Sequence, residues 1–342
     1  MSNRMRRLLI LLLMGLGMGG VLSVRAANTP SPATDERKPN ITPAAGYLFA
    51  HMTKSDYGHL YYSLSRDGLH WTPLNGGKRV NNEYRGHPDI TRGHDGRYYL
   101  TGGSNAIELW VSPDLVAWSR LRTLEPDLTH DPNFKPAEKT YGAPKITWDA
   151  DTRQYLLTWH TSQNEKLKEL PEHYWAGQRT LYVTSPDLQT FSEPKRLFEF
   201  EMATIDVIVR NEAGRYYAIV KDERYPSFDW PTGKTIRVCQ APALTGPYTE
   251  PGPKISPNFR EAPTLIPRHD GKGWRVFYEQ YPGLQYGCST APSLAGPWYE
   301  EYYPDYTIPA ETRHGCIFPI DSEAVDRLTK AYGPGSQAQE QK

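Results

Sequence analysis

Six polar side chains interrupt apolar, β-rich stretches of the sequence, and their types suit acid–base chemistry. They are His87, Asp89, Lys145, Asp206, Glu261 and His314. An acidic residue inside an apolar strand, such as Asp206 in the run 203–223, is costly to bury unless it is paired, hydrogen-bonded or facing a wet cavity. Carboxylates, lysine and histidine gathered in one cavity are the groups that general acid–base catalysis uses. The sequence therefore predicts a functional site if these stretches lie together.

The stretches that carry these residues are copies of a repeated pattern. One unit is an apolar strand, a turn and a second strand, and it occurs at residues 87–100, 143–157, 203–223 and 261–278. A second unit is a strand of small and hydroxyl residues that leads through a turn to an aromatic residue. It occurs at residues 60–71, 109–118, 181–191, 236–248 and 286–298.

The repeat count predicts an all-β fold, a five-bladed β-propeller of radially arranged four-stranded sheets. The fifth innermost strand is expected at Arg313–Ile320, where it would complete the blade that begins at residues 46–71. The ring would then close by pairing of the N- and C-terminal segments. Innermost strands line the central funnel of a propeller, so the six polar residues are expected to meet there.

The two ends of the chain are expected to lie outside the propeller. Residues 1–26 combine a basic start, an apolar run and small residues, which is the pattern of a signal peptide. The predicted parts are that signal peptide, a Pro- and Thr-rich linker at 27–43, the propeller at 44–321, and a C-terminal tail at 322–342 with one short helix at 322–332. The mature protein is thus expected to be periplasmic or secreted, without a membrane anchor.

The composition narrows the class of partner. Lys plus Arg and Asp plus Glu number 39 each, so no excess of charge favours nucleic acid or an anionic membrane surface. Tyr outnumbers Phe 23 to 9, and there are nine Trp, a bias typical of carbohydrate clefts and also of half-buried strand tyrosines. The three cysteines are expected to be small buried side chains.

With these residues in hand, the chain resembles glycoside hydrolase family 43 over residues 46–320. The most specific matching segments are TIDVIV and GRYYAIVKDER within 204–224, EAPTLIP at 261–267 and RHG at 313–315, with weaker support from 142–149 and 65–78. The resemblance implies a five-bladed propeller that cleaves arabinofuranosyl, xylosyl or galactofuranosyl-type glycosides of an oligo- or polysaccharide with inversion. The alternative function is a carbohydrate-binding propeller that has lost its catalytic base.

The resemblance also implies roles for the acidic residues. Glu261 matches the general acid, and Asp206 matches the carboxylate that orients the acid and raises its pKa. The sequence departs from the family at the base, because His87 stands where an Asp is usual. Asp89 lies two residues further on, on the same strand face, and is the preferred base. His87 itself, another route of water activation, or loss of hydrolysis are the remaining possibilities.

Other positions are candidates for substrate binding. Lys145, where relatives usually carry an acid, could bind a negatively charged sugar or pair with Asp206. His314 resembles a central histidine that in some members helps to hold a calcium ion or water, although a hydrogen bond to a carboxylate is the simpler expectation; no cofactor is expected otherwise. Arg224 completes the list of polar candidates. The aromatic candidates for stacking on a sugar are Tyr141, Trp159, Trp175, Tyr225 and Trp230.

Overall fold

The structure is a computed structural model of the 342-residue chain, and it describes residues 44–127, 136, 139–163, 171–228, 231–283 and 285–334. The predicted signal peptide and linker at 1–43, Trp230, and the last eight residues of the predicted tail lie outside the described residues. Among the described residues, no helix has the length and apolar character needed to cross a membrane.

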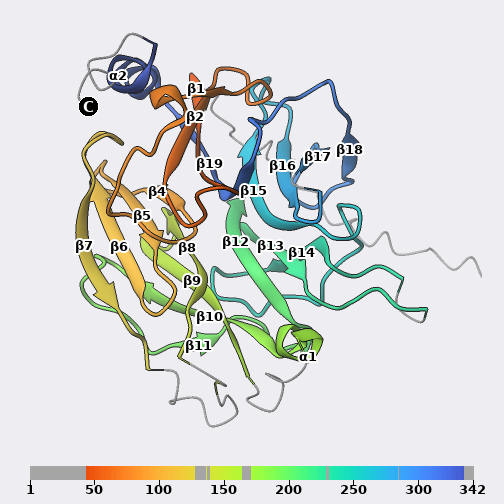
Figure 1. The fold of residues 1–342 in the computed structure, drawn as a ribbon. Coiled ribbons are helices and arrows are strands. Elements are labelled where there is room, and N and C mark those ends of the chain that lie inside the picture. The colour runs from red at the N-terminus through yellow and green to blue at the C-terminus, as the bar shows by residue number, and fades with distance from the viewer. Residues whose placement is uncertain are drawn as a thin grey trace, which may run out of the picture. The chain divides into compact units, whose positions relative to one another are not determined.

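Five sheets stand around a common centre, as the sequence repeat predicts (Figure 1). From the innermost strand outward, the first blade consists of β19 (Thr312–Ile320), β1 (Gly46–Thr53), β2 (Tyr61–Ser65) and β3 (Thr72–Pro73). The second consists of β4 (Asp89–Arg92), β5 (Tyr98–Gly102), β6 (Ile107–Ser112) and β7 (Ser119–Leu124), and the third of β8 (Gly142–Asp149), β9 (Gln154–Ser162), β10 (Gln178–Ser185) and β11 (Lys195–Arg196). The fourth consists of β12 (Thr204–Glu212), β13 (Arg215–Asp222) and β14 (Thr235–Ala241), and the fifth of β15 (Glu261–Pro267), β16 (Trp274–Gln280), β17 (Gln285–Ala291) and β18 (Tyr299–Glu301).

The ring of blades closes through strands from both ends of the propeller. Strand β19 pairs antiparallel with β1, from Gly46 opposite Ile320 to Thr53 opposite Thr312. Each innermost strand contacts that of the next blade, in the order β4, β8, β12, β15, β19 and back to β4. The fold class and the predicted closure by residues 313–320 are therefore confirmed.

The fourth blade differs from the prediction because it has three assigned strands. The segment after β14 still runs beside it, since the amides of Thr249, Gly252 and Ile255 donate to carbonyls of β14. Three prolines in residues 251–257 lack the N–H that a regular ladder needs. The edge of this blade is therefore an irregular segment.

Four of the innermost strands bulge near the same end. In β8, β12, β15 and β19 the pairing register shifts so that two residues oppose one on the neighbouring strand. In the first three of these bulges one residue, Ala143, Asp206 or Ala262, has a positive φ, of 40°, 53° and 46° respectively. Non-glycine residues adopt this conformation rarely, and bulges next to functional sites re-aim side chains. The repeated bulge therefore sets side-chain directions at the mouth of the funnel.

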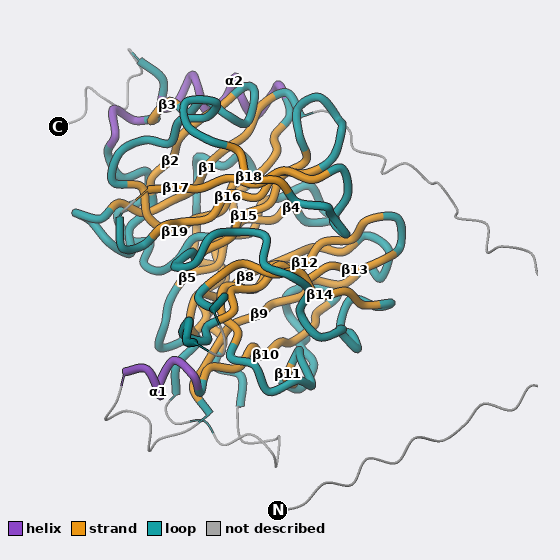
Figure 2. Tube along the Cα trace, turned by 90° about the vertical axis from the view of Figure 1, so that its right-hand side faces the viewer, coloured by secondary structure: helices purple, strands orange, loops and turns teal. Residues whose placement is uncertain are grey.

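Helices are short and lie at the margins of the strands (Figure 2). They are the 3-10 turn η1 (Asn75–Gly77), α1 (Pro171–Ala176) and α2 (Ser322–Tyr332). The predicted helix at 322–332 forms, with its start capped by Asp321, whose side chain accepts from the Ala324 amide at 2.8 Å. Its Val325 and Leu328 are fully buried in a cluster with side chains of β1, β2 and β5. Helix α2 therefore packs against the first two blades.

Buried side chains between neighbouring blades form the core. Most are Tyr, Leu, Ile and Val of the strands, in clusters that bridge adjacent sheets. Cys239, Cys288 and Cys316 are free and buried, as the sequence predicts for small packing residues. The strands are thus held as a rigid frame around the polar centre.

Candidate active site

Three of the predicted polar residues meet at the bulged end of the innermost strands. Asp206 lies in the β12 bulge, Glu261 begins β15, and His314 is the third residue of β19. One carboxylate oxygen of Asp206, one of Glu261 and one imidazole nitrogen of His314 all lie within 4.8 Å of one another. Three separate blades therefore bring two carboxylates and an imidazole to one point, which we call the funnel cluster.

Glu261 is the most accessible carboxylate of the funnel cluster, with 14% of its side chain exposed. Its Oε1 lies 3.0 Å from His314 Nε2, and its Oε2 accepts a hydrogen bond of 2.8 Å from Lys221 Nζ. Burial alone raises the pKa of Glu261, but the Lys221 ammonium and the His314 imidazole outweigh burial and hold the pKa well below its usual value. In the ligand-free protein, Glu261 is therefore an anion at neutral pH.

His314 has the opposite tendency. Burial lowers its pKa, but the hydrogen bond and the negative charge of Glu261, with further charge from Asp206 and Glu279, raise the pKa above the usual 6.5. The His314 amide also donates to Glu279 Oε2 at 2.9 Å, which fixes the backbone of β19 against β16. The expected hydrogen bond from His314 to a carboxylate is confirmed.

A chain of alternating charges leads away from Glu261 through the fourth blade. Lys221 Nζ lies 2.9 Å from Glu223 Oε2 as well as beside Glu261, and the other oxygen of Glu223 accepts from Lys234. All three are almost fully buried. Burial lowers the pKa of Lys221, but Glu261 and Glu223 raise it above its usual value, so Lys221 keeps its charge. This network positions the Glu261 carboxylate.

Asp206 is held as a buried acceptor. Its side chain is almost completely buried, and its Oδ2 accepts a hydrogen bond of 3.0 Å from the Ala262 amide in the next blade. The bond joins the β12 bulge to the β15 bulge immediately after Glu261. Asp206 therefore fixes the backbone next to Glu261, and its predicted role of raising the pKa of the acid stays a prediction.

Asp89 occupies a structural position and not the open funnel. It is 3% exposed, and its Oδ2 accepts a hydrogen bond of 2.9 Å from the Ile146 amide in the third blade. Lys145 Nζ lies 3.8 Å from Asp89 Oδ1, so the partner of Lys145 is Asp89 and not the predicted Asp206. Strand β4 has no register shift, so its residues keep the regular alternation that turns Asp89 toward the neighbouring blade.

His87 takes the place that Asp89 was expected to fill. It precedes β4 and is half-buried, with its ring 4.3 Å from that of His314 and its Nε2 2.9 Å from the Tyr57 hydroxyl. Burial, followed by the charges of His314, Lys145 and His160, lowers the pKa of His87 well below its usual value. At neutral pH His87 is uncharged, and one of its nitrogens is a potential proton acceptor.

Two predicted stacking residues are core residues instead. Tyr141 and Trp159 are 0% and 1% exposed and pack against each other with ring centroids 5.8 Å apart. The prediction of a sugar platform at these two positions is wrong, because their faces are covered by the third blade. Tyr225 is 49% exposed with the Lys234 ammonium 4.2 Å from its ring centre, and it remains a candidate.

Arg224 lies at the end of β13, where its guanidinium donates two hydrogen bonds of 2.9 Å to the buried Asp222 carboxylate. Its side chain is 38% exposed. Arg224 therefore has a structural partner, and its part in substrate binding stays a prediction.

Sequence reasoning did not single out four residues around the funnel cluster: Tyr57, Lys221, Glu279 and Arg313. Lys221 and Glu279 lie on the second strands of their blades, next to the bulges of β12 and β15. The side chain of Arg313 forms an ion pair with Glu279 and lies 3.6 Å from Glu261. For Lys221, Glu279 and Arg313 the only signal in the sequence was a charged residue near the end of an apolar strand, which surface residues also give, and Tyr57 gave no signal.

A calcium ion fits the funnel cluster poorly. Calcium takes six to eight oxygen ligands, whereas Asp206, Glu261 and His314 offer two carboxylates and one nitrogen. Lys221 Nζ, 2.8 Å from Glu261 Oε2, already neutralises the carboxylate that a cation would need. The proposed mechanism therefore uses no metal.

Comparisons with known proteins show which family the chain belongs to. A family described as "Probable glycosyl hydrolase domain", related to family 43, matches residues 87–326, from His87 through Asp206, Glu261 and His314 into α2. A curated α-L-arabinofuranosidase of Bifidobacterium longum is 26% identical over 194 residues, which are 49% of this chain but 18% of that protein. The matched part is therefore about a fifth of that relative.

One solved structure shows the same fold, and a second is given for comparison. An arabinoxylan arabinofuranohydrolase of family 43 from Bacillus subtilis superposes with a TM-score of 0.51 at 13% identity, covering 80% of this chain and 66% of that one. An α-L-arabinofuranosidase from Lactobacillus brevis gives a TM-score of 0.48 at 14% identity, covering 64% of this chain and 72% of that one. Because the family match spans well over half of the sequence, the chain belongs to the glycosyl hydrolases related to family 43.

Proposed function

We propose that the protein hydrolyses arabinofuranosyl, xylosyl or galactofuranosyl-type units of a neutral glycan in its central funnel, with inversion. The observation that carries this proposal is the funnel cluster, in which Asp206, Glu261 and His314 gather on three blades of a propeller of this family. The name of the Bifidobacterium longum relative, an α-L-arabinofuranosidase, favours an arabinofuranosyl unit among the three.

Glu261 is the proposed proton donor, supplied through His314. The two side chains are 3.0 Å apart and share one titrating proton, which rests on His314 in the free protein. A glycosidic oxygen bound beside Glu261 would accept this proton as the bond to the anomeric carbon breaks. The nearby carboxylate of Asp206 favours the protonated pair, because it repels a second negative charge.

His87 is the proposed base. Asp89 is bonded to Ile146 and lies beside Lys145, whereas His87 is half-buried next to the funnel cluster. An uncharged imidazole can take a proton from the attacking water, and the Tyr57 hydroxyl orients the ring. The lowered pKa makes His87 a weak base, so we expect slow turnover compared with an enzyme that uses a carboxylate.

A carbohydrate-binding function without catalysis is the second candidate. Two observations favour it: Lys221 holds Glu261 as an anion, and Asp89, the carboxylate nearest the usual base position, is engaged in structural contacts. Under this alternative, the same funnel would bind the glycan and leave its bonds intact.

We further propose that the protein works in the periplasm or is secreted, on the strength of the signal-peptide pattern of residues 1–26. N-terminal sequencing of protein recovered outside the cytoplasm should find a start near Ala27. Recovery of exported protein that begins at Met1 would contradict the proposal.

One assay distinguishes hydrolysis from carbohydrate binding without catalysis. Purified protein is incubated with chromogenic arabinofuranosides, xylosides and galactofuranosides and with the matching polysaccharides. Glu261→Gln should lower hydrolysis by about 10²–10⁴-fold, because it removes the proton donor and keeps the shape. Glu83→Gln, at an exposed position, is the matched control and should behave as the wild type. Binding of a glycan without hydrolysis by the wild type would establish the second candidate.

A further inference from the structure

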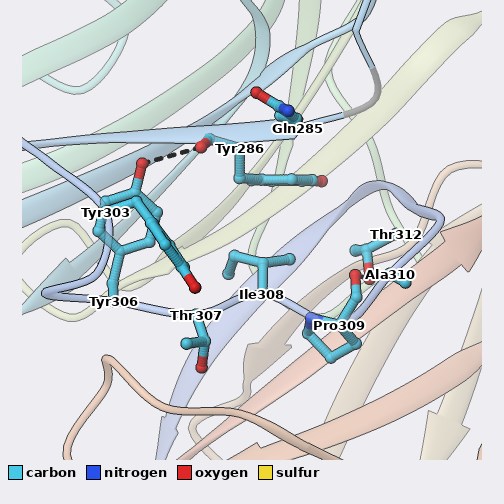
Figure 3. A pocket seen from close by; sticks show the side chains of 9 residues that line it. All are labelled: Gln285, Tyr286, Tyr303, Tyr306, Thr307, Ile308, Pro309, Ala310 and Thr312. Atoms are coloured by element: carbon cyan, nitrogen blue, oxygen red, sulfur yellow. Dashed lines mark hydrogen bonds between the residues drawn. The ribbon is translucent and has the colours of Figure 1, made fainter.

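A cavity of about 630 Å³ lies between the fifth blade and the segment that joins it to the first, and the proposed mechanism does not use it. The residues that line this side cavity are Gln285, Tyr286, Tyr303, Tyr306, Thr307, Ile308, Pro309, Ala310 and Thr312 (Figure 3). Its volume falls within the range of small-molecule sites in proteins. In Figure 3, the Tyr286 ring lies on one side of the cavity, with Ile308 and Pro309 on the other.

The side cavity opens on the same face of the propeller as the funnel cluster. Strand β15 leaves that face at Glu261 and β16 returns to it at Gln280, so β17 begins on it at Gln285. Strand β19 begins there too, and its first residue, Thr312, lines the side cavity two positions before His314. The charges of Glu279, Arg313 and Glu261 act on the Tyr286 hydroxyl, although burial is the main cause of its raised pKa.

The lining has the chemistry of a sugar site. None of the nine lining residues carries a charge, which favours a neutral ligand. Tyr303 is 78% exposed, so one large aromatic face is open to solvent at the rim. An aromatic ring with polar groups beside it suits the C–H face and the hydroxyls of a pyranose or furanose. The amide of Gln285 and the hydroxyl of Thr307 supply such groups.

Two tyrosines fix the inner wall of the side cavity. The Tyr286 side chain is about nine-tenths buried, and its hydroxyl is enclosed, so Tyr286 presents its ring and not its hydroxyl to the cavity. The neighbouring Tyr306 hydroxyl donates to the Tyr286 carbonyl at 2.8 Å, which holds the two residues together. The cavity wall is therefore aromatic, and its polar groups lie at Gln285 and Thr307.

We propose that the side cavity is a second sugar-binding subsite, which holds a neutral sugar residue of the same glycan whose terminal or branching unit enters the funnel. Tyr303 would stack on the ring of that sugar, and the Gln285 amide and the Thr307 hydroxyl would bond its hydroxyls. The proposal rests on the proposed function, because the funnel must bind the glycan that reaches the side cavity.

The test compares long and short substrates. The long substrate is a fragment of three to five sugars from arabinoxylan, arabinan or β-1,3-galactan, and the short one is the p-nitrophenyl glycoside of one sugar. The ratio of kcat/KM on the long substrate to kcat/KM on the short one measures the contribution of the side cavity. Tyr303→Ala should lower this ratio about tenfold, a loss of about 1.4 kcal/mol of stacking and burial. Thr307→Val keeps the shape of the side chain, removes the hydroxyl and should lower the ratio by a smaller factor. Tyr302→Ala is the matched control, since Tyr302 is 66% exposed and does not line the cavity.

Direct binding distinguishes failure of the subsite from failure of the hydrolase. Calorimetric titration of the same fragments into Glu261→Gln protein, with and without Tyr303→Ala, needs no turnover. Weaker binding on Tyr303→Ala supports the subsite even if the wild type hydrolyses nothing. Hydrolysis with an unchanged ratio and unchanged binding overturns the subsite and leaves the hydrolase standing. Neither binding nor hydrolysis of any fragment overturns both.

Discussion

Replacing Lys221 with Met should raise the pKa of Glu261 and move the basic limb of the pH–activity profile upward. Lys221 Nζ lies 2.8 Å from Glu261 Oε2, and only 3% of the lysine side chain is exposed. An opposite charge at such a distance lowers a carboxyl pKa by about 1–3 units, and each unit corresponds to about 1.4 kcal/mol. Methionine keeps the length of the side chain and removes its charge, so burial, which raises the pKa of Glu261, would be opposed by His314 but no longer by Lys221.

The sign follows from the role of Glu261 as proton donor. Activity disappears as the pH rises through the pKa of the Glu261–His314 pair, because the pair then has no proton to give. A raised pKa keeps the pair protonated to higher pH, so the basic limb of kcat/KM should move up by about 1–3 pH units. The measurement is kcat/KM on an aryl glycoside across the pH range in which thermal unfolding shows the variant to be folded.

Lys221→Arg is the matched control, because it keeps the charge beside Glu261 and Glu223. Its basic limb should lie close to that of the wild type. The explanation fails if folded Lys221→Met protein has an unchanged basic limb, or if the limb moves downward. Lys221 would then not control the protonation of Glu261.

Three further substitutions test separate parts of the structure. Asp89→Asn keeps an acceptor for the Ile146 amide but leaves Lys145 without its ion pair. Calorimetry should therefore find the free energy of unfolding lower by about 1–3 kcal/mol. A variant that is as stable as the wild type but inactive would instead make Asp89 the base. His87→Gln should lower kcat/KM by about 10²–10⁴-fold with little change in stability, if His87 accepts the proton of water; wild-type rates would exclude that role. Leu328→Ala should lower the free energy of unfolding by about 2–5 kcal/mol, because Leu328 is fully buried against the first blade. A change near zero would mean that the packing of α2 does not stabilise the propeller.

The architecture was predictable because most blades have two recognisable sequence units, one for the inner strands and one for the outer strands. Closure of the ring by residues 313–320 followed from the one blade that lacked an inner strand, and β19 fills that place. The missing fourth strand of blade four was harder to foresee. It depends on prolines between residues 251 and 257 that remove ladder donors.

The candidate site could be predicted where a polar residue interrupts an apolar innermost strand, as Asp206 does, or begins one, as Glu261 does. The alternation rule failed at His87, because that residue precedes β4 and strand parity does not apply to it. Lys221 was missed because its position next to the β12 bulge depends on pairing between two strands. Trp159 shows a further limit, since an aromatic residue near the end of a strand has the same sequence pattern whether it packs in the core or binds a sugar.

The configuration of the first product tests the central claim most directly. Proton NMR of the wild type with an α-L-arabinofuranoside, or with the best substrate of the panel, follows the anomeric proton of the sugar as it is released. Inversion predicts that the anomer opposite to the substrate appears first, and that Glu261→Gln delays its appearance by about 10²–10⁴-fold. First appearance of the retained anomer, or equal rates for the wild type and Glu261→Gln, would contradict hydrolysis by this funnel with Glu261 as the acid.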